Sequence, residues 1–379
     1  MKKGDIKFIL TAFLSWRVLL LFFVTLGALI FPLQQNFLGG GIENYLKNPY
    51  FWAWSNFDGE HYASIAQHGY GNGEQAFFPL YPILMKLLAG PWKGSLTALN
   101  FSGLLISNVS FLLALLGLYK LVRLDFSDKI SKSTIFFLLL FPTSFFFGAV
   151  FTESPFLAIA VWTFYFARKA KWFYALILGG LASGARFIGI VLLPALIIEW
   201  WKGGKKNKNI FVFAPILAMA GLIFYMIYLN GSVGDPLAFI KTLPGFGEQR
   251  SATPIILPRV FYRYFFKILP SLTWSYFPVV FTTLLELSVS ILFVILALLA
   301  FFKLRLSYAV YLSLGYLLPT LSGSFSSLPR YVIVLFPAFI LLALWLNKRQ
   351  KIVKHVVFLI LFVLLSVACA LFVRGFWVS

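Results

Sequence analysis

The sequence predicts an all-α protein that crosses a membrane several times and forms a single integral membrane domain over residues 1–379. Two observations predict this fold class. Hydrophobic residues make up 60% of the chain and charged residues only 12%, which lies far outside the composition of soluble domains. Apolar runs that are long enough to span a bilayer also recur along the chain.

The distribution of the basic residues supports the same fold class. The net charge is +20, but the basic residues cluster in short segments between the apolar runs. These segments are Lys2/Lys3/Lys7, Lys120/Arg123/Lys129/Lys132, Arg168/Lys169/Lys171, Lys202/Lys205/Lys206/Lys208, Lys303/Arg305 and Lys348/Arg349/Lys351/Lys354. Clusters of this kind are typical of cytoplasmic loops. They argue against a nucleic-acid partner and indicate membrane lipids as the surroundings.

The first apolar run, residues 8–31, predicts a helix of about 36 Å, enough to cross a hydrocarbon core of about 30 Å. It has no small-residue cleavage site, so we interpret it as a retained anchor with a cytoplasmic N-terminus. Residues 33–95 then form a long first extracytoplasmic loop. Within this loop, the stretch 76–88 is too short to span and predicts a re-entrant or interfacial helix.

The basic clusters decide how the rest of the chain is threaded. Residues 172–200 are flanked by basic residues, which favours two half-membrane helices broken at 183–186 over a single span. The single span remains an alternative, and it would reverse the side of everything downstream. Before this segment, residues 96–119 run inward and residues 133–167 run out and back, with a break near 151–155. After it, residues 210–229 run outward and residues 230–278 form a second outer loop. The last four segments are 279–302 inward, 306–321 outward, 329–346 inward and 355–374 outward. The chain thus has about eleven transmembrane or half-membrane helices, grouped as 96–229 and 279–374 around the second loop, with its C-terminus outside.

This threading gathers unusual polar residues on the extracytoplasmic face. Asp58, Glu60, His61, Tyr62 and His68 lie in the stretch "NFDGEHYASIAQHGY" of the first loop. A helix starting near Asp58 places that residue on one face with His61 or Tyr62 and with Ile65. Asp58 follows an aromatic-rich stretch, which favours a general base with a raised pKa. The alternatives are a helix N-cap and, less favoured because of the loose spacing, a divalent metal site with His61 and His68.

Three further ionisable residues lie within or beside apolar stretches. Placing an ionisable side chain in the membrane costs free energy, so such residues indicate a functional site. Glu153 and Arg186 are either a structural ion pair or part of a substrate site, in which Arg186 binds an anionic group such as phosphate. Arg330 begins a predicted helix, where anions are favoured; alternatively its side chain extends to the interface. The stretch 258–270 predicts a basic amphipathic helix, for which attraction to anionic lipid is favoured over a substrate contact.

No nucleotide-binding motif is present, so any group-transfer reaction must use a donor that is already in the membrane. Five blocks in order along residues 50–345 resemble one known family. They are "WSNFDGEHYASIAQHGY" with "AFFPLYPILMKLL", "LFPTSFFFGAVFTESPFLAIAVWTFYFARK", "GGLASGARFIGIVLLPALIIEW" and "SLPRYVIVLFPAFILLA". The chain resembles the PIG-V type mannosyltransferases, which add the second mannose in GPI-anchor synthesis, and their prokaryotic relatives in the glycosyltransferase-C superfamily.

The resemblance implies an extracytoplasmic active site in a prokaryotic plasma membrane, or a lumenal one in a eukaryote. It also implies a polyprenyl-phosphate sugar donor, most often of mannose, and inversion at the anomeric carbon. Asp58 matches the acidic residue of the first outer loop and is the candidate base. The candidate substrate-binding residues are Glu60, His61, Tyr62, Glu153, Arg186 and Arg330. No cofactor is predicted, and the acceptor stays open among lipid, glycan and protein.

The competing hypothesis is a transporter or lipid-handling protein that uses the same polar cavity. Transporters often carry internal repeats with broken helices in corresponding halves. No convincing repeat is evident in this sequence, which favours the enzyme.

Overall fold

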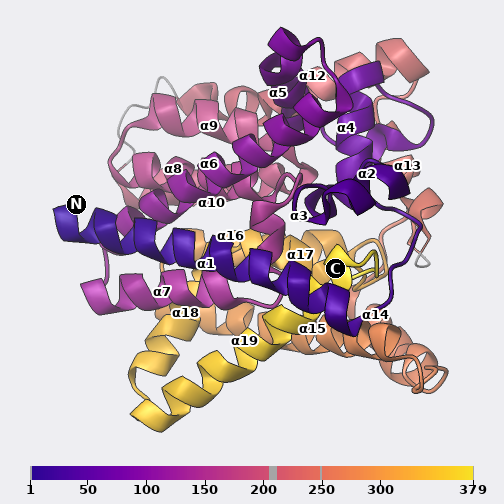
Figure 1. Ribbon diagram of the computed structural model, residues 1–379. Helices are drawn as coiled ribbons and strands as arrows, with labels where there is room; N and C mark the ends of the chain where they lie inside the picture. The colour runs from indigo at the N-terminus through magenta and orange to yellow at the C-terminus, as the bar shows by residue number, and fades with distance from the viewer. Residues whose placement is uncertain (1, 205–210, 248–249, 379) are drawn as a thin grey trace.

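The computed structural model describes residues 2–204, 211–247 and 250–378, and every regular element within those ranges is helical (Figure 1). Five helices in these ranges are long and apolar enough to cross a membrane, or six if one bent pair counts as a span. They are α1 (Lys3–Ile30), α6 (Leu96–Val122), α12 (Ala214–Val233), α15 (Phe277–Lys303) and α19 (Lys351–Val373). The chain is thus a multi-pass membrane protein, with five or six full-length candidate spans among the described residues. This count does not include the half-membrane helices that the sequence also predicts.

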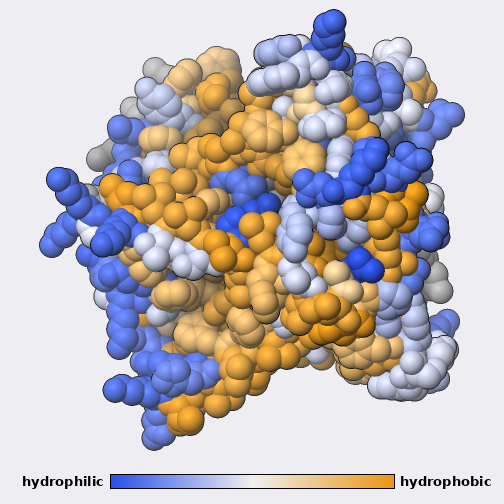
Figure 2. Space-filling view, viewed as in Figure 1, coloured by the Kyte–Doolittle hydropathy of each residue, from blue (hydrophilic) through white to orange (hydrophobic). Residues whose placement is uncertain are grey.

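Shorter helices fill the space between the candidate spans. Those of the bundle are α7 (Asp128–Leu140), α8 (Glu153–Arg168), α9 (Trp172–Ala185), α10 (Leu192–Lys202), α16 (Leu306–Thr320), α17 (Leu328–Tyr331) and α18 (Phe336–Asn347); those of the two predicted loops are α2 (Gly41–Lys47), α3 (Pro49–Trp52), α4 (Asp58–His68), α5 (Leu80–Ala89), α13 (Ala238–Lys241) and α14 (Leu257–Arg263). Figure 2 shows hydrophobic surface across the middle of the molecule and hydrophilic surface at its left and right margins, as expected of a protein that lies across a bilayer.

Local sequence signals account for many of the helix ends. Ser95 precedes α6, and its hydroxyl accepts a hydrogen bond from the amide of Ala98 at 3.3 Å. Ser127 caps α7 in the same way. Proline stands in the first turn of α12, α15, α17 and α18, where its missing N–H costs nothing.

An ion-pair network joins the basic ends of several helices. Arg168, the last residue of α8, lies 2.5 Å from Asp125 and 3.2 Å from Glu199 of α10. Arg305, just before α16, lies 3.2 Å from Asp125 and 3.5 Å from Glu199. Burial alone would raise the pKa of Asp125, but the two guanidinium groups lower it below its usual value.

This network shows how the segment 172–200 is folded. Arg168 precedes α9 and Glu199 lies in the last turns of α10, so their ion pair brings both ends of the segment to the same end of the bundle. Between them the chain breaks at Arg186, where extended backbone (φ −157°, ψ 147°) ends α9. The geometry agrees with two short helices broken near residues 183–186 and disagrees with a single span.

The helix before this break, α9, packs very close to α12. A Cβ atom at Gly221 of α12 would collide with the backbone of Gly180 and Gly184 of α9. Glycine at all three positions therefore lets the two helix backbones approach each other, as at helix contacts in membranes. This contact fixes the end of α9 and, with it, the position of Arg186.

Residues 329–346, predicted as one inward segment, form a bent pair of helices and not one straight helix. The chain bends by 83° between Leu328–Val334 and Phe336–Asn347. The physical reason is Pro337, which stands in the first turn of α18 and has no N–H to continue the preceding helix. The bend leaves α17 as a separate short helix in the interior.

The two predicted surface helices are also present. In the stretch 76–88, α5 packs on α6, and the hydroxyl of Tyr81 lies 2.9 Å from the Gly103 carbonyl, to which it donates. In the stretch 258–270, α14 continues into a π-helical turn over Tyr264–Ile268, and Arg259 and Lys267 are exposed.

Candidate active site

Asp58 is the first residue of α4, and its side chain points to an arginine from the other end of the chain. Oδ2 of Asp58 lies 2.6 Å from Nη1 of Arg330. The residue before it, Phe57, has a left-handed backbone (φ 59°), a strained conformation for a non-glycine residue that concentrates at functional sites. Asp58 itself makes no capping bond in this helix, so the N-cap alternative is wrong.

Arg330 lies in α17 at the centre of the site. Its side chain is only 6% exposed. Its guanidinium lies against the rings of Phe146, Phe151 and Tyr331 at 5.1–5.4 Å. α17 also begins after a left-handed non-glycine residue, Ser327 (φ 66°). Because Arg330 is buried against aromatic rings and a carboxylate, the alternative in which it extends to the membrane interface is wrong.

Glu153 and Arg186 complete a chain of charges. Glu153 is the first residue of α8, and its Oε1 is hydrogen-bonded to Nη1 of Arg186. The same oxygen lies 3.6 Å from Nε of Arg330. We call Asp58, Arg330, Glu153 and Arg186 the charge network. The predicted pairing of Glu153 with Arg186 is present, but as one part of this larger cluster.

Hydroxyl groups surround the charge network. The Tyr62 hydroxyl lies 3.3 Å from Thr152 Oγ1, which also accepts a hydrogen bond from Arg186 Nη1 at 3.3 Å. The Tyr331 hydroxyl lies 3.4 Å from Nη2 of Arg330. Burial raises the pKa of Tyr62 well above its usual value, so its hydroxyl keeps its proton and remains available as a donor.

Two buried atoms of the network have no hydrogen-bond partner within the described residues. They are Oε2 of Glu153 and Nε of Arg330. Buried polar atoms without a partner are rare in native proteins and call for an explanation. A substrate bearing hydroxyl and phosphate groups would supply a donor for the first atom and an acceptor for the second.

His61 and Glu60 lie outside the charge network although both belong to α4. His61 Nδ1 is 3.0 Å from Glu74 Oε1, and its ring stacks on Phe77 with centroids 4.7 Å apart. Glu60 and His68 instead line a separate cavity of about 230 Å³. Among the described residues no three His, Cys, Asp or Glu side chains come together as metal ligands, so Asp58, His61 and His68 do not form the metal site considered above.

Glu60 is predicted to make stability depend on pH. Burial raises its pKa to about 7, so the folded state holds a proton that the unfolded chain releases near pH 4.5. Stability should therefore fall as the pH rises from about 4.5 through 7. The fall should be about 1–2 kcal/mol, because solvent screening at this partly exposed side chain reduces the effect of the full pKa shift. Thermal unfolding of the detergent-solubilised protein at pH 5 and pH 8 measures this loss. The Glu60→Gln variant should show a smaller loss over that range, and an equal loss would contradict the prediction.

The sequence analysis missed three residues of this site. Arg250 donates from Nη2 to the Ser327 hydroxyl at 2.9 Å, beside the start of α17. Thr152 and Tyr331 are neighbours in sequence of the predicted Glu153 and Arg330, and that adjacency was the available signal. Arg250 lies in the loop 230–278 and has no comparable signal, because only the fold brings it to α17.

The arrangement combines two carboxylates with two guanidinium groups at the edge of a buried region. Asp58 is 17% exposed and Arg186 is 12% exposed, so both side chains are partly accessible. A carboxylate accepts a proton, and guanidinium groups bind phosphate oxygens in a bidentate manner. The site therefore has the groups needed to activate a hydroxyl and to stabilise a departing phosphate.

One comparison with known proteins identifies a family. The family model described as Mannosyltransferase (PIG-V) matches residues 6–202, just over half of the chain. The match includes Asp58, Glu153 and Arg186, whereas Arg330 lies beyond it. A comparison with curated proteins returned no match.

Proposed function

We propose that this chain, which belongs to the PIG-V mannosyltransferase family and is therefore a glycosyltransferase, transfers mannose from polyprenyl-phosphate mannose to an acceptor hydroxyl. The observation that carries the proposal is the charge network. It joins one partly exposed carboxylate, Asp58, to the guanidinium groups of Arg330 and, through Glu153, Arg186. These are the two kinds of group that sugar transfer from a phosphate needs.

In the proposed reaction Asp58 is the general base. Its carboxylate takes the proton of the acceptor hydroxyl as that oxygen attacks C1 of the mannose. The bond between C1 and the phosphate oxygen breaks at the same time, and polyprenyl phosphate leaves with the bonding electrons. Attack from the face opposite the leaving group inverts the configuration at C1.

Arg330 and Arg186 would stabilise the negative charge that develops on the leaving phosphate. Glu153 is a positioning residue in this scheme, since its Oε1 lies beside both guanidinium groups.

The charge network would lie on the extracytoplasmic side of the membrane. Glu153 and Arg168 are the first and last residues of α8, so they lie about 22 Å apart along the helix axis. Arg168 belongs to the basic end of the bundle, which the positive-inside rule assigns to the cytoplasm. This orientation gives a cytoplasmic N-terminus, an external C-terminus and about eleven transmembrane or half-membrane segments.

The orientation and the absence of a nucleotide-binding motif together support a lipid-linked donor. A polyprenyl-phosphate sugar has its phosphate at the interface and its tail in the bilayer. It can therefore reach a site at membrane depth without a soluble nucleotide sugar. The acceptor contributes a hydroxyl group on a lipid, glycan or protein.

The donor can be tested with the purified full chain in detergent. Radiolabelled polyprenyl-phosphate mannose and a labelled nucleoside-diphosphate mannose are each incubated with the protein and a membrane extract that supplies acceptors. We expect labelled product from the lipid donor alone, with the anomeric configuration inverted relative to the donor. Transfer from the nucleotide sugar alone would contradict the proposal.

A further inference from the structure

Arg17 is a cation in the middle of a candidate membrane span. It is the fifteenth of the 28 residues of α1, with apolar residues on both sides. Its Nη1 donates to the Gly148 carbonyl at 3.1 Å, and its guanidinium lies 4.7 Å from the centre of a Trp54 ring. No described carboxylate lies within 4 Å of its guanidinium nitrogens. Ionisable side chains inside membranes are costly and usually have a partner.

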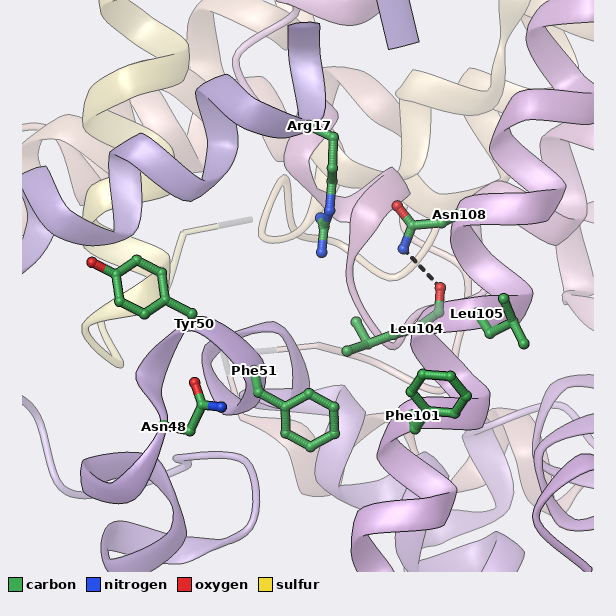
Figure 3. A pocket seen from close by; sticks show the side chains of 8 residues that line it. All are labelled: Arg17, Asn48, Tyr50, Phe51, Phe101, Leu104, Leu105 and Asn108. Atoms are coloured by element: carbon green, nitrogen blue, oxygen red, sulfur yellow. Dashed lines mark hydrogen bonds between the residues drawn. The ribbon is translucent and has the colours of Figure 1, made fainter. Parts of the chain in front are cut away.

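The side chain of Arg17 enters a pocket of about 450 Å³. Figure 3 shows it extending from α1 into a space bounded by α3 and α6. The lining residues are Arg17, Asn48, Tyr50, Phe51, Phe101, Leu104, Leu105 and Asn108. They comprise one cation, two amides, one phenol and four apolar side chains, without any carboxylate. Such a set of hydrogen-bond donors is suited to an anion.

The pocket opens toward the lipid. Figure 2 shows a hydrophilic hollow within hydrophobic surface, in the region between α1 and α6. Leu105 is 40% exposed and Phe101 is 52% exposed at its edge, as expected of lipid-facing side chains. An occupant therefore needs a negative charge for Arg17 and an apolar part that can lie along α6.

We propose that the Arg17 pocket binds the phosphate of an anionic membrane lipid, which enters sideways from the bilayer. The guanidinium forms the ion pair with the phosphate. The side-chain amide of Asn48 adds a hydrogen bond. Asn108 Nδ2 donates to the Leu104 carbonyl at 2.7 Å (Figure 3) and has a second N–H for the phosphate. The acyl or isoprenoid chain packs on Phe101 and Leu105. Gly148 makes room for this arrangement, because a Cβ atom there would collide with the Arg17 guanidinium.

The pocket includes no residue of the charge network, but Arg17 contacts the two segments that precede Asp58 and Glu153. Trp54, under the guanidinium, lies four residues before Asp58, and its carbonyl accepts a hydrogen bond from Val150 at 2.8 Å. Gly148 lies five residues before Glu153. A lipid held by Arg17 thus supports the two segments that carry the carboxylates of the network. The binding proposal does not depend on the proposed reaction.

Native mass spectrometry of the purified full chain tests the site. Phosphatidylglycerol, polyprenyl phosphate and zwitterionic phosphatidylcholine are titrated separately, with inorganic phosphate as a tail-free probe. We expect tighter binding of the two anionic lipids than of phosphatidylcholine or inorganic phosphate. Arg17→Gln should weaken the binding of the anionic lipids about tenfold or more, because it removes a charged hydrogen bond. Competition between the two anionic lipids identifies which of them is preferred.

Two further variants keep the test decisive. Arg123→Gln removes an exposed charge at the basic end of α6 and should leave this binding unchanged, which separates the pocket from general attraction to anionic lipid. Leu105→Trp should block the pocket while Arg17 stays in place, in case Arg17→Gln does not fold. Wild-type lipid binding in both Arg17→Gln and Leu105→Trp, or equal binding of phosphatidylcholine, would overturn the proposal.

Discussion

Replacing Asp58 with asparagine is expected to lower the rate of sugar transfer by about 10²–10⁴-fold. The change removes one negative charge and leaves the size of the side chain almost unchanged. Its amide oxygen can still accept a hydrogen bond from Arg330, which lies 2.6 Å from the carboxylate in the wild type. It cannot take the proton of the acceptor hydroxyl, so the fall should appear in kcat more than in KM.

Glu43→Gln is a suitable control for this variant. Glu43 lies in the first turn of α2, in the same predicted outer loop, and it belongs neither to the charge network nor to the Glu60 cavity. Glu43→Gln should unfold at a temperature close to that of the wild type. Asp58→Asn should unfold at a lower temperature, because the buried Arg330 guanidinium loses one of its two carboxylates. Only Asp58→Asn should lose activity. Full activity of folded Asp58→Asn would remove Asp58 from the role of base.

The sequence was sufficient to predict where the long helices lie. The ends of the predicted runs 96–119, 279–302 and 355–374 fall within four residues of the ends of α6, α15 and α19. Long apolar segments are reliable because the bilayer itself sets their length. Short helices are less predictable, since contacts with other helices replace that constraint, and the bend at Leu335 was missed for this reason.

The candidate site was predictable residue by residue but not as an arrangement. Ionisable residues in apolar surroundings indicated Asp58, Glu153, Arg186 and Arg330 one at a time. Their partners were not predictable, because Asp58 and Arg330 are 272 positions apart and only the fold brings them together. For His61, proximity in sequence did not indicate the partner. It is three residues from Asp58 on a helix, yet Glu74 binds its side chain outside the charge network.

Arg17 was overlooked because the first apolar run was analysed for its length alone. The argument that identified Glu153 and Arg186, namely the cost of an ionisable group among apolar residues, applies equally to Arg17. The sequence does not show that the Arg17 guanidinium has no carboxylate of the described residues within 4 Å. That absence depends on which loops lie against α1, and it distinguishes the Arg17 pocket from the charge network.

Replacing Arg330 with glutamine is expected to affect both activity and stability. Transfer should fall by about 10²–10³-fold, because a cation beside the leaving phosphate is lost. Stability should fall by about 3–5 kcal/mol, because Asp58 and Glu153 lose a buried counter-ion. Arg330→Lys should be little more active than Arg330→Gln. An ammonium group cannot reproduce the planar set of N–H donors by which a guanidinium contacts two carboxylates at once.

The double variant Asp58→Asn with Arg330→Gln separates the two effects. It removes the carboxylate that Arg330→Gln leaves unpaired, while Glu153 keeps its bond to Arg186. Part of the lost stability should therefore return, as a double-mutant cycle of thermal unfolding would show by a coupling energy clearly different from zero. Activity should stay at or below the level of Asp58→Asn, because neither the base nor the phosphate-binding cation is restored. Zero coupling would mean that the ion pair is not maintained in the membrane-embedded protein, and the charge network could then not carry the reaction.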